Sequence, residues 1–182
     1  MEQEPDRERD AFFQGVVQRH SRFLYRVAYS VLRHPADAED AVGDALLKLL
    51  RGDAWRHISQ ERAFLARAVF RTALDRRRAR APAGEEAALF EVEDSRPSPE
   101  ELADERGQQR LLRGLLDGLP AALREPLLLC AIEEMNSREI GEVMGIPEGT
   151  VRTRLMRARA ALREGYEQLQ RGVREVAVRG DP

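Results

Sequence analysis

The sequence has few of the residues that mark secreted, disulfide-bonded or membrane proteins. Cys130 is the only cysteine among 182 residues, so no internal disulfide can form, and its apolar neighbours favour a place in the core. No segment is long and apolar enough to span a bilayer, and the first residues do not resemble a signal peptide. We therefore expect a cytoplasmic protein without membrane insertion.

Residues that commonly carry catalysis or bind metals are also scarce. The three histidines, His20, His34 and His57, are scattered and have no cysteine or acidic partners at the spacing of a metal site. No nucleophile elbow, phosphate-binding loop or dinucleotide fingerprint occurs. The sequence thus predicts a protein that is not an enzyme, with no catalytic residue, no metal and no cofactor.

A formal net charge of −2 conceals a strong segregation of charge along the chain. Residues 67–80 hold one acid, Asp75, among Arg67, Arg71, Arg76, Arg77, Arg78 and Arg80. Residues 84–105 hold one base, Arg96, among Glu85, Glu86, Glu91, Glu93, Asp94, Glu100, Glu101, Asp104 and Glu105. Segments of opposite sign indicate different binding partners.

Residues 136–159 carry the most informative pattern, because they read as two helices around a tight turn. Asn136 and Glu139 are spaced as a capping box at the start of the first helix. Gly141 leaves room for a close approach by the second helix, and Gly145 suits a left-handed helix end. Pro147 is then typical of a helix start. This layout is that of a helix-turn-helix, whose second helix enters the DNA major groove.

The second helix of this motif has one apolar stripe and one polar face. The stripe consists of Val151, Leu155, Ala158 and Leu162. At about 100° per residue, the residues that point away from it are Thr150, Thr153, Met156 and Arg157, with Arg152 and Arg154 on its flanks. A solvated amphipathic helix is the alternative, but the caps, turn and basic face together favour DNA contact.

Helical periodicity continues through the rest of the chain, and no alternating strand pattern competes with it. We predict helices over 11–32, 37–50, 60–78, 100–117, 121–134, 137–144 and 148–170. Pro126 should bend the fifth of these or weaken its first turns. Acidic residues and prolines make 81–99 a linker that cannot pack a core.

The fold class is therefore all-α, with two small helical domains joined by a flexible acidic linker. The expected order is a flexible N-terminus (1–10), a first helical domain (11–80), the linker (81–99), a helix-turn-helix domain (100–170) and a tail (171–182). Three apolar faces should form the first core. They are Phe12, Val16, Phe23, Val27 and Val31; then Val42, Leu46, Leu49 and Leu50; then Phe64, Leu65, Ala68, Val69 and Leu74.

Several segments resemble bacterial sigma factors of the sigma-70 family, in particular the extracytoplasmic-function (ECF) group. The matching segments in the first domain are 37–42, 46–50 and 63–78. Those in the second are Leu119-Pro120 with Arg124, Glu139-Ile-Gly141, Gly149-Thr-Val-Arg152 and Arg157-Ala-Arg159. The likeness extends over about residues 11–170.

The resemblance implies a factor that binds core RNA polymerase and directs promoter recognition and transcription initiation. The first domain would bind the polymerase clamp and open the −10 element, and the second would read the −35 element and touch the flap. An anti-sigma protein is the further expected partner. The alternative is an autonomous helix-turn-helix regulator that binds operators without polymerase.

The expected contacts fall into three sets. For the −35 element they are Ser137, Arg138, Thr150, Arg152, Thr153, Arg154 and Arg157, with Arg152, Thr153 and Arg157 on base edges and the others on phosphates. For the −10 element they are Arg67, Arg71, Arg76, Arg77 and Arg78, with Trp55, Phe64 and Phe70 nearby for base stacking, although core packing is favoured for Phe64. For core polymerase they are Asp37, Glu39, Asp40 and Lys48.

The chain departs from the family pattern at a few positions. Gly43 stands where Gln is usual, and Gly141 where Ala is common. Phe64 replaces a common Trp. Arg71 replaces the usual Asn of the −10-reading helix, so it would bind phosphate or stack on a base instead.

Overall fold

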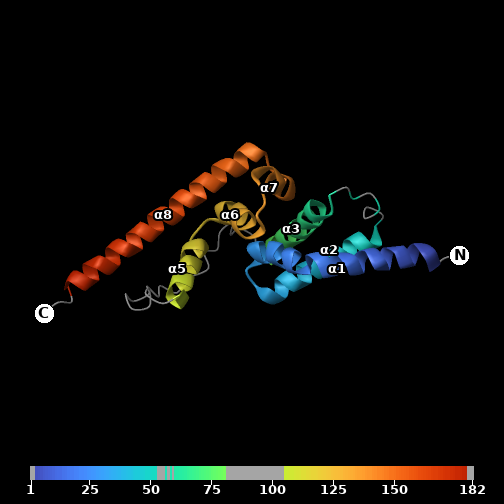
Figure 1. The fold of residues 1–182 in the computed structure, drawn as a ribbon, viewed down its shortest axis with the longest axis horizontal. Coiled ribbons are helices and arrows are strands. Elements are labelled where there is room, and N and C mark those ends of the chain that lie inside the picture. Colours follow the sequence, from blue (N-terminus) through green and yellow to red (C-terminus); the bar gives the residue numbers. More distant parts are fainter. Residues whose placement is uncertain (1–2, 53–55, 57, 59, 81–104, 180–182) are drawn as a thin grey trace. The chain divides into compact units, whose positions relative to one another are not determined.

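Every regular element among the described residues is a helix, which confirms the all-α prediction. The computed structural model describes residues 3–52, 56, 58, 60–80 and 105–179, and no strand occurs among them (Figure 1). Over these ranges, no helix is both long enough and apolar enough to cross a membrane. The linker prediction falls on residues that lie outside the described part.

The chain divides into two compact units that do not follow the linear order of the predicted domains. One unit comprises residues 1–86 together with 128–151. The other comprises residues 87–127 together with 152–182. The first part of the helix-turn-helix therefore packs with the N-terminal helices.

The first unit is built on three helices that pack against one another, α1 (Gln3–Leu32), α2 (Pro35–Arg51) and α3 (Glu61–Arg80) (Figure 1). The residues of α1 in the core are Phe13, Val16, Phe23, Leu24, Val27, Ala28 and Val31. Four of the five predicted members of this face are among them, whereas Phe12 is only half-buried beside Phe13. The Arg19 guanidinium and the His20 ring of α1 bind the Glu61 carboxylate at the start of α3, at 3.0 and 2.7 Å.

The predicted apolar face of α2 is wrong, because small residues occupy the core instead. Ala38, Ala41 and Ala45 are almost fully buried, which lets α2 approach its neighbours closely. Val42, Leu46, Leu49 and Leu50 are only half-buried, and Leu47 is 49% exposed. The larger apolar side chains of α2 thus form a partly exposed face.

Helix α3 buries a face shifted from the predicted one. Its core residues are Leu65, Ala66, Val69, Phe70, Thr72 and Ala73, whereas Phe64, Ala68 and Leu74 are half-buried. Leu65 and Val69 alone were predicted correctly. Helix α7 (Ser137–Met144) packs against α3 within the same unit.

The second unit contains α5 (Glu105–Asp117) and most of α8 (Glu148–Arg179), while α6 (Ala121–Glu133) begins in it. Helix α5 packs against α8. A Cβ atom added to Gly165 of α8 would lie only 2.7 Å from the Leu115 side chain of α5. α6 continues through Pro126, whose side chain is fully buried.

Both ends of the helical region extend beyond their predicted limits. α1 begins at Gln3, so residues 3–10 are helical where a flexible N-terminus was expected. α8 runs to Arg179, through most of the predicted tail. Cys130 is half-buried, less than a core position requires.

Candidate nucleic-acid interface

The start of α7 has the predicted capping box. The Asn136 side chain accepts hydrogen bonds from the backbone N–H groups of Arg138 and Glu139, both at 3.0 Å. The Glu139 carboxylate in turn accepts the Asn136 N–H at 2.8 Å. These bonds satisfy N–H groups that have no partner inside the helix, and so they fix where α7 begins.

The turn between α7 and α8 depends on two glycines. Gly145 has a φ of 70° in the left-handed region, and its N–H donates to the carbonyl of Gly141 at 2.8 Å. A Cβ on Gly141 would lie 2.8 Å from the carbonyl oxygen of Ile146, closer than packed atoms approach. Both glycine predictions are confirmed, and the turn is tight because Gly141 has no side chain.

The start of α8 separates buried and exposed faces as predicted. Val151, Leu155 and Ala158 are buried, whereas Leu162, the fourth predicted member of the stripe, is half-buried. The residues proposed to face DNA are exposed at Arg152, Thr153 and Arg157 and half-buried at Thr150 and Arg154. Met156 is 64% exposed and lies in the same outward face. A polar, cationic surface beside a rigid apolar stripe matches the recognition helix of a DNA reader.

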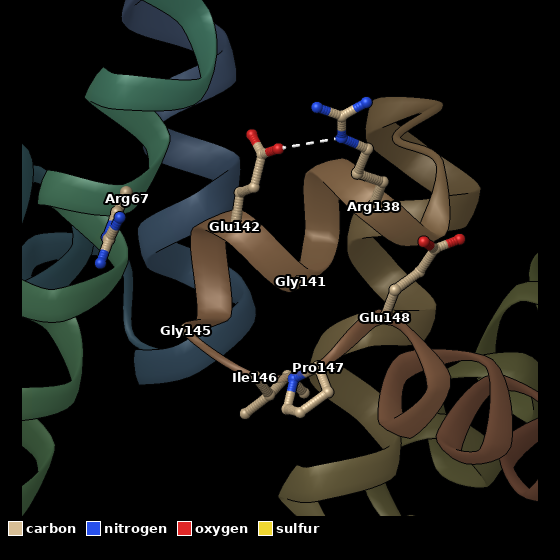
Figure 2. Close-up of a pocket in the computed structure, with 8 residues that line it drawn as sticks. All are labelled: Arg67, Arg138, Gly141, Glu142, Gly145, Ile146, Pro147 and Glu148. Carbon is tan, nitrogen blue, oxygen red and sulfur yellow. Dashed lines mark hydrogen bonds and ion pairs between the residues drawn. The ribbon is translucent and has the colours of Figure 1, made fainter.

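Residues at the beginning of α7 border this surface. Ser137 is half-buried, and Arg138 is exposed with its Nε 3.3 Å from the Glu142 carboxylate. Figure 2 shows this ion pair at a hollow between α7 and the turn, with Arg67 of α3 on the opposite side. Because both partners are largely exposed, the ion pair stabilises the helix little and can be exchanged for phosphate.

On α3, two of the five arginines predicted for the −10 element are accessible to a phosphate group. Arg67 and Arg71 are exposed, are one helical turn apart, and make no ion pair within the described residues. Arg78 is also exposed, with only a 3.9 Å contact to Asp75. Arg77 is half-buried.

Arg76 is different, because it is half-buried and bound to two acids of α2. Its guanidinium donates to Asp44 at 2.7 and 3.0 Å and to Asp40 at 3.3 Å. The hydrogen bonds to Asp44 raise the pKa of Arg76 above its ordinary value, although partial desolvation opposes them. This arrangement ties α3 to α2 and argues against Arg76 as a DNA contact.

The acids proposed to meet polymerase also divide into two kinds. Asp37 is buried, and its carboxylate contacts His34 at 3.3 Å and the Arg80 guanidinium. Glu39 and Lys48 are exposed, as is Asp40 apart from its bond to Arg76. Asp37 therefore stabilises the α2 start and its junction with α3, while the exposed residues remain accessible to a partner.

Burial removes one of the aromatic residues that were predicted to stack on bases. Phe70 is 1% exposed and belongs to the core, so it cannot stack on a base. Phe64 is half-buried. The prediction for Trp55 lies outside the described residues.

Sequence reasoning missed the ionic centre around Glu133. This carboxylate, 3% exposed, is bound by Arg26 of α1 and approached by Arg62 of α3. Its hydrogen bond raises the pKa of Arg26 above the ordinary value, although desolvation opposes the effect. The adjacent acids Glu133 and Glu134 gave no sign that one would be buried.

Comparison with known proteins identifies the family. Residues 16–82 match the model described as sigma-70 region 2, and residues 109–162 match that of sigma-70, region 4. The chain is 34% identical over 162 residues to the ECF RNA polymerase sigma factor SigM of Mycobacterium tuberculosis, covering 88% of this chain and 80% of that protein.

Two further relatives agree. The chain is 30% identical over 161 residues to SigE of Mycolicibacterium smegmatis, covering 82% of this chain but 59% of that longer protein. It is 26% identical over 168 residues to SigW of Bacillus subtilis, covering 86% and 90%. Both are ECF RNA polymerase sigma factors.

The chain therefore belongs to the ECF group of the sigma-70 family. It is a promoter-recognition factor that works with core RNA polymerase, and it is not an enzyme. The alternative of a regulator acting without polymerase is not favoured.

Proposed function

We propose that the two domains predicted from the sequence divide promoter recognition between them. Residues 11–80 bind core polymerase and open the −10 element, and residues 100–170 read the −35 element. The observation that carries this division is the outward face of α8, where Arg152, Thr153 and Arg157 stand exposed beside a buried apolar stripe.

In the −35 contact, Arg152, Thr153 and Arg157 meet base edges. Thr150 and Arg154, half-buried at the flanks, meet phosphates, as do Ser137 and Arg138 at the start of α7. An arginine that binds guanine through two hydrogen bonds discriminates by about 1–3 kcal/mol against the wrong base.

In the −10 contact, Arg67 and Arg71 are the principal phosphate-binding residues, with Arg77 and Arg78 further along α3. Their exposure and the lack of an ion pair at Arg67 and Arg71 within the described residues support this role. Replacing Arg71 by Ala should lower the salt dependence of promoter binding by about one counterion.

For polymerase, the proposed surface is the partly exposed face of α2. Glu39, Asp40 and Lys48 are exposed on the same helix as half-buried Leu46 and exposed Leu47, so α2 offers both the charged and the apolar groups of a protein interface. We assign this face to the clamp and the second domain to the flap. An anti-sigma protein that covers either surface would hold the factor inactive, and the cytoplasm is its place of action.

The test is reconstitution with core polymerase and run-off transcription from promoters with a varied −35 element. Arg157→Ala should relax preference at one or two positions, and a matched control is Arg163→Ala. Arg163 is exposed on the same helix, about 240° around from Arg157. A uniform loss across all sequences would make Arg157 a phosphate contact, and no transcription with the unmodified chain would refute the function.

A further inference from the structure

The second half of α1 carries two tyrosines and two arginines in one row. Arg22, Tyr25, Tyr29 and Arg33 follow one another at intervals of three or four residues, so their side chains leave the helix on one side. Arg22 and Tyr29 are exposed, while Tyr25 and Arg33 are half-buried. We call these four residues the tyrosine row.

Stacking orders the side chains of the tyrosine row. The Tyr25 and Tyr29 rings are stacked, with centroids 5.9 Å apart and planes 21° from parallel. The Arg33 guanidinium carbon lies over the Tyr29 ring, 5.9 Å from its centroid, which is within the range of a cation–π contact. Tyr29 thus lies between a second aromatic ring and a planar cation.

Arg33 has an unusual backbone conformation for its residue type. Its φ is 58°, in the left-handed region that glycine adopts without strain. Its N–H donates to the Tyr29 carbonyl at 3.0 Å, and glycine is the usual residue where a helix ends in this way. A strained arginine at this position indicates that its side chain has a function.

This part of α1 contributes only positive charge. No Asp or Glu occurs within residues 11–36, which contain four arginines. Arg19 and Arg26 are bound to acids of other helices, whereas Arg22 makes no ion pair within the described residues. The tyrosine row therefore combines aromatic rings with cationic side chains, the two features that bind unpaired nucleotides.

A nucleobase fits between the Tyr29 ring and the Arg33 guanidinium after a small movement. Bases stack at about 3.4 Å, so an inserted base needs about 6.8 Å between its two neighbours. The observed separation of 5.9 Å requires the Arg33 guanidinium to move outward by about 1 Å. A base paired within a duplex cannot enter such a slot, so the row selects unpaired strands.

We propose that the tyrosine row binds unpaired DNA, with one base held between Tyr29 and Arg33 and a phosphate further along the strand bound by Arg22. The strand is the one released when the factor opens the −10 element, so this inference rests on the proposed function. The aromatic residues expected to stack on that strand do not offer an exposed ring within the described residues, because Phe70 is buried and Phe64 is half-buried. The tyrosine row offers one.

The test is binding of a fluorescein-labelled oligothymidylate to the full chain without polymerase, measured by fluorescence anisotropy. The unmodified chain should bind, and Tyr29→Leu should weaken binding about fivefold to tenfold because a stacking partner is lost. Tyr29→Phe keeps the ring and should restore the affinity. Tyr166→Leu is the matched control, because Tyr166 is an exposed tyrosine on α8, and it should leave binding unchanged.

Arg33→Gly removes the cation from the slot without backbone strain, and it carries the test if Tyr29→Leu fails to fold by circular dichroism. It should weaken binding and reduce the slope of log affinity against log salt concentration by about 0.7. An oligonucleotide of the same length without bases should bind the unmodified chain and Tyr29→Leu equally weakly.

Equal affinity of the unmodified chain for strands with and without bases would show that only phosphates are bound, and it would overturn the proposal. Tighter binding of oligouridylate, with the same dependence on Tyr29, would overturn it in favour of an RNA site.

With core polymerase, Tyr29→Leu should also shorten the lifetime of open promoter complexes, and an unchanged lifetime would refute a role in initiation. Failure of the unmodified chain to initiate transcription would instead refute the proposed function, because oligonucleotide binding is measured without polymerase.

Discussion

The turn of the helix-turn-helix gives a quantitative test at Gly141. A methyl group added there would lie 2.8 Å from the Ile146 carbonyl oxygen and 3.6 Å from the Glu148 nitrogen. Both neighbours are backbone atoms, so no flexible side chain can move aside. Gly141→Ala must therefore displace the turn that positions the first residues of α8.

The expected free-energy change combines two opposing effects. Replacing Gly by Ala within a helix stabilises it by about 1 kcal/mol. Overpacking a close contact costs about 1–3 kcal/mol. Gly141→Ala should thus range from neutral to about 2 kcal/mol destabilising. Gly43→Ala is the matched control, because Gly43 is an exposed helical glycine with no atom within 4 Å of the added methyl group.

Urea unfolding followed by circular dichroism measures both variants under the same conditions. Gly43→Ala should stabilise the protein by about 0.5–1 kcal/mol. Gly141→Ala should be about 1–3 kcal/mol less stable than that control. Equal stabilisation by the two substitutions would show that the turn is not tight, and the reasoning about the recognition helix would fail with it.

Three further predictions concern charged residues of α2 and α3. Desolvation opposes ionisation of Glu61, but its bonds to Arg19 and His20 dominate and hold its pKa below the ordinary 4.5. Glu61→Gln should therefore cost about 0.5–1 kcal/mol above pH 5, and the difference from the parent should shrink as pH falls below about 4.5 in urea titrations. A pH-independent difference would contradict this. Asp37→Asn should lower stability by about 1–3 kcal/mol through the lost bonds to a buried carboxylate. Lys48→Ala should leave stability unchanged and weaken polymerase binding in a pull-down; the reverse pattern would restore Asp37 as the polymerase contact.

The sequence was most informative where structure depends on neighbouring residues. The capping box of Asn136 and Glu139, the left-handed Gly145 and the start at Pro147 are all set within a few positions. Helix-turn-helix geometry follows from such local rules, so it could be predicted without knowledge of the fold. Three members of the predicted α8 stripe, Val151, Leu155 and Ala158, are buried for the same reason, whereas Leu162 is only half-buried.

Predictions failed where a residue's environment depends on distant parts of the chain. On α2 the sequence favoured the larger apolar residues for the core, whereas close packing of helices selected Ala38, Ala41 and Ala45. Arg76 looked like its neighbours, yet acids 32 and 36 positions away bind it. Glu133 meets Arg26 across 107 positions, and no local pattern encodes that contact.

The arginines therefore serve two purposes that composition alone does not separate. Arg19, Arg26, Arg76 and Arg80 bind acids on other helices and fix how those helices pack. On the basic faces, Arg67, Arg71 and Arg157 make no ion pair within the described residues.

A guanidinium already bonded to a carboxylate must lose that bond to reach a phosphate, so the exchange adds little to DNA affinity. Promoter affinity should therefore depend on the exposed arginines Arg67, Arg71 and Arg157. The arginines that bind acids on other helices should instead determine stability. Substitutions of the exposed arginines should change the salt dependence of promoter binding. Substitutions of the ion-paired arginines should change the free energy of unfolding. The two measurements together separate DNA recognition from folding in a chain whose net charge is close to zero.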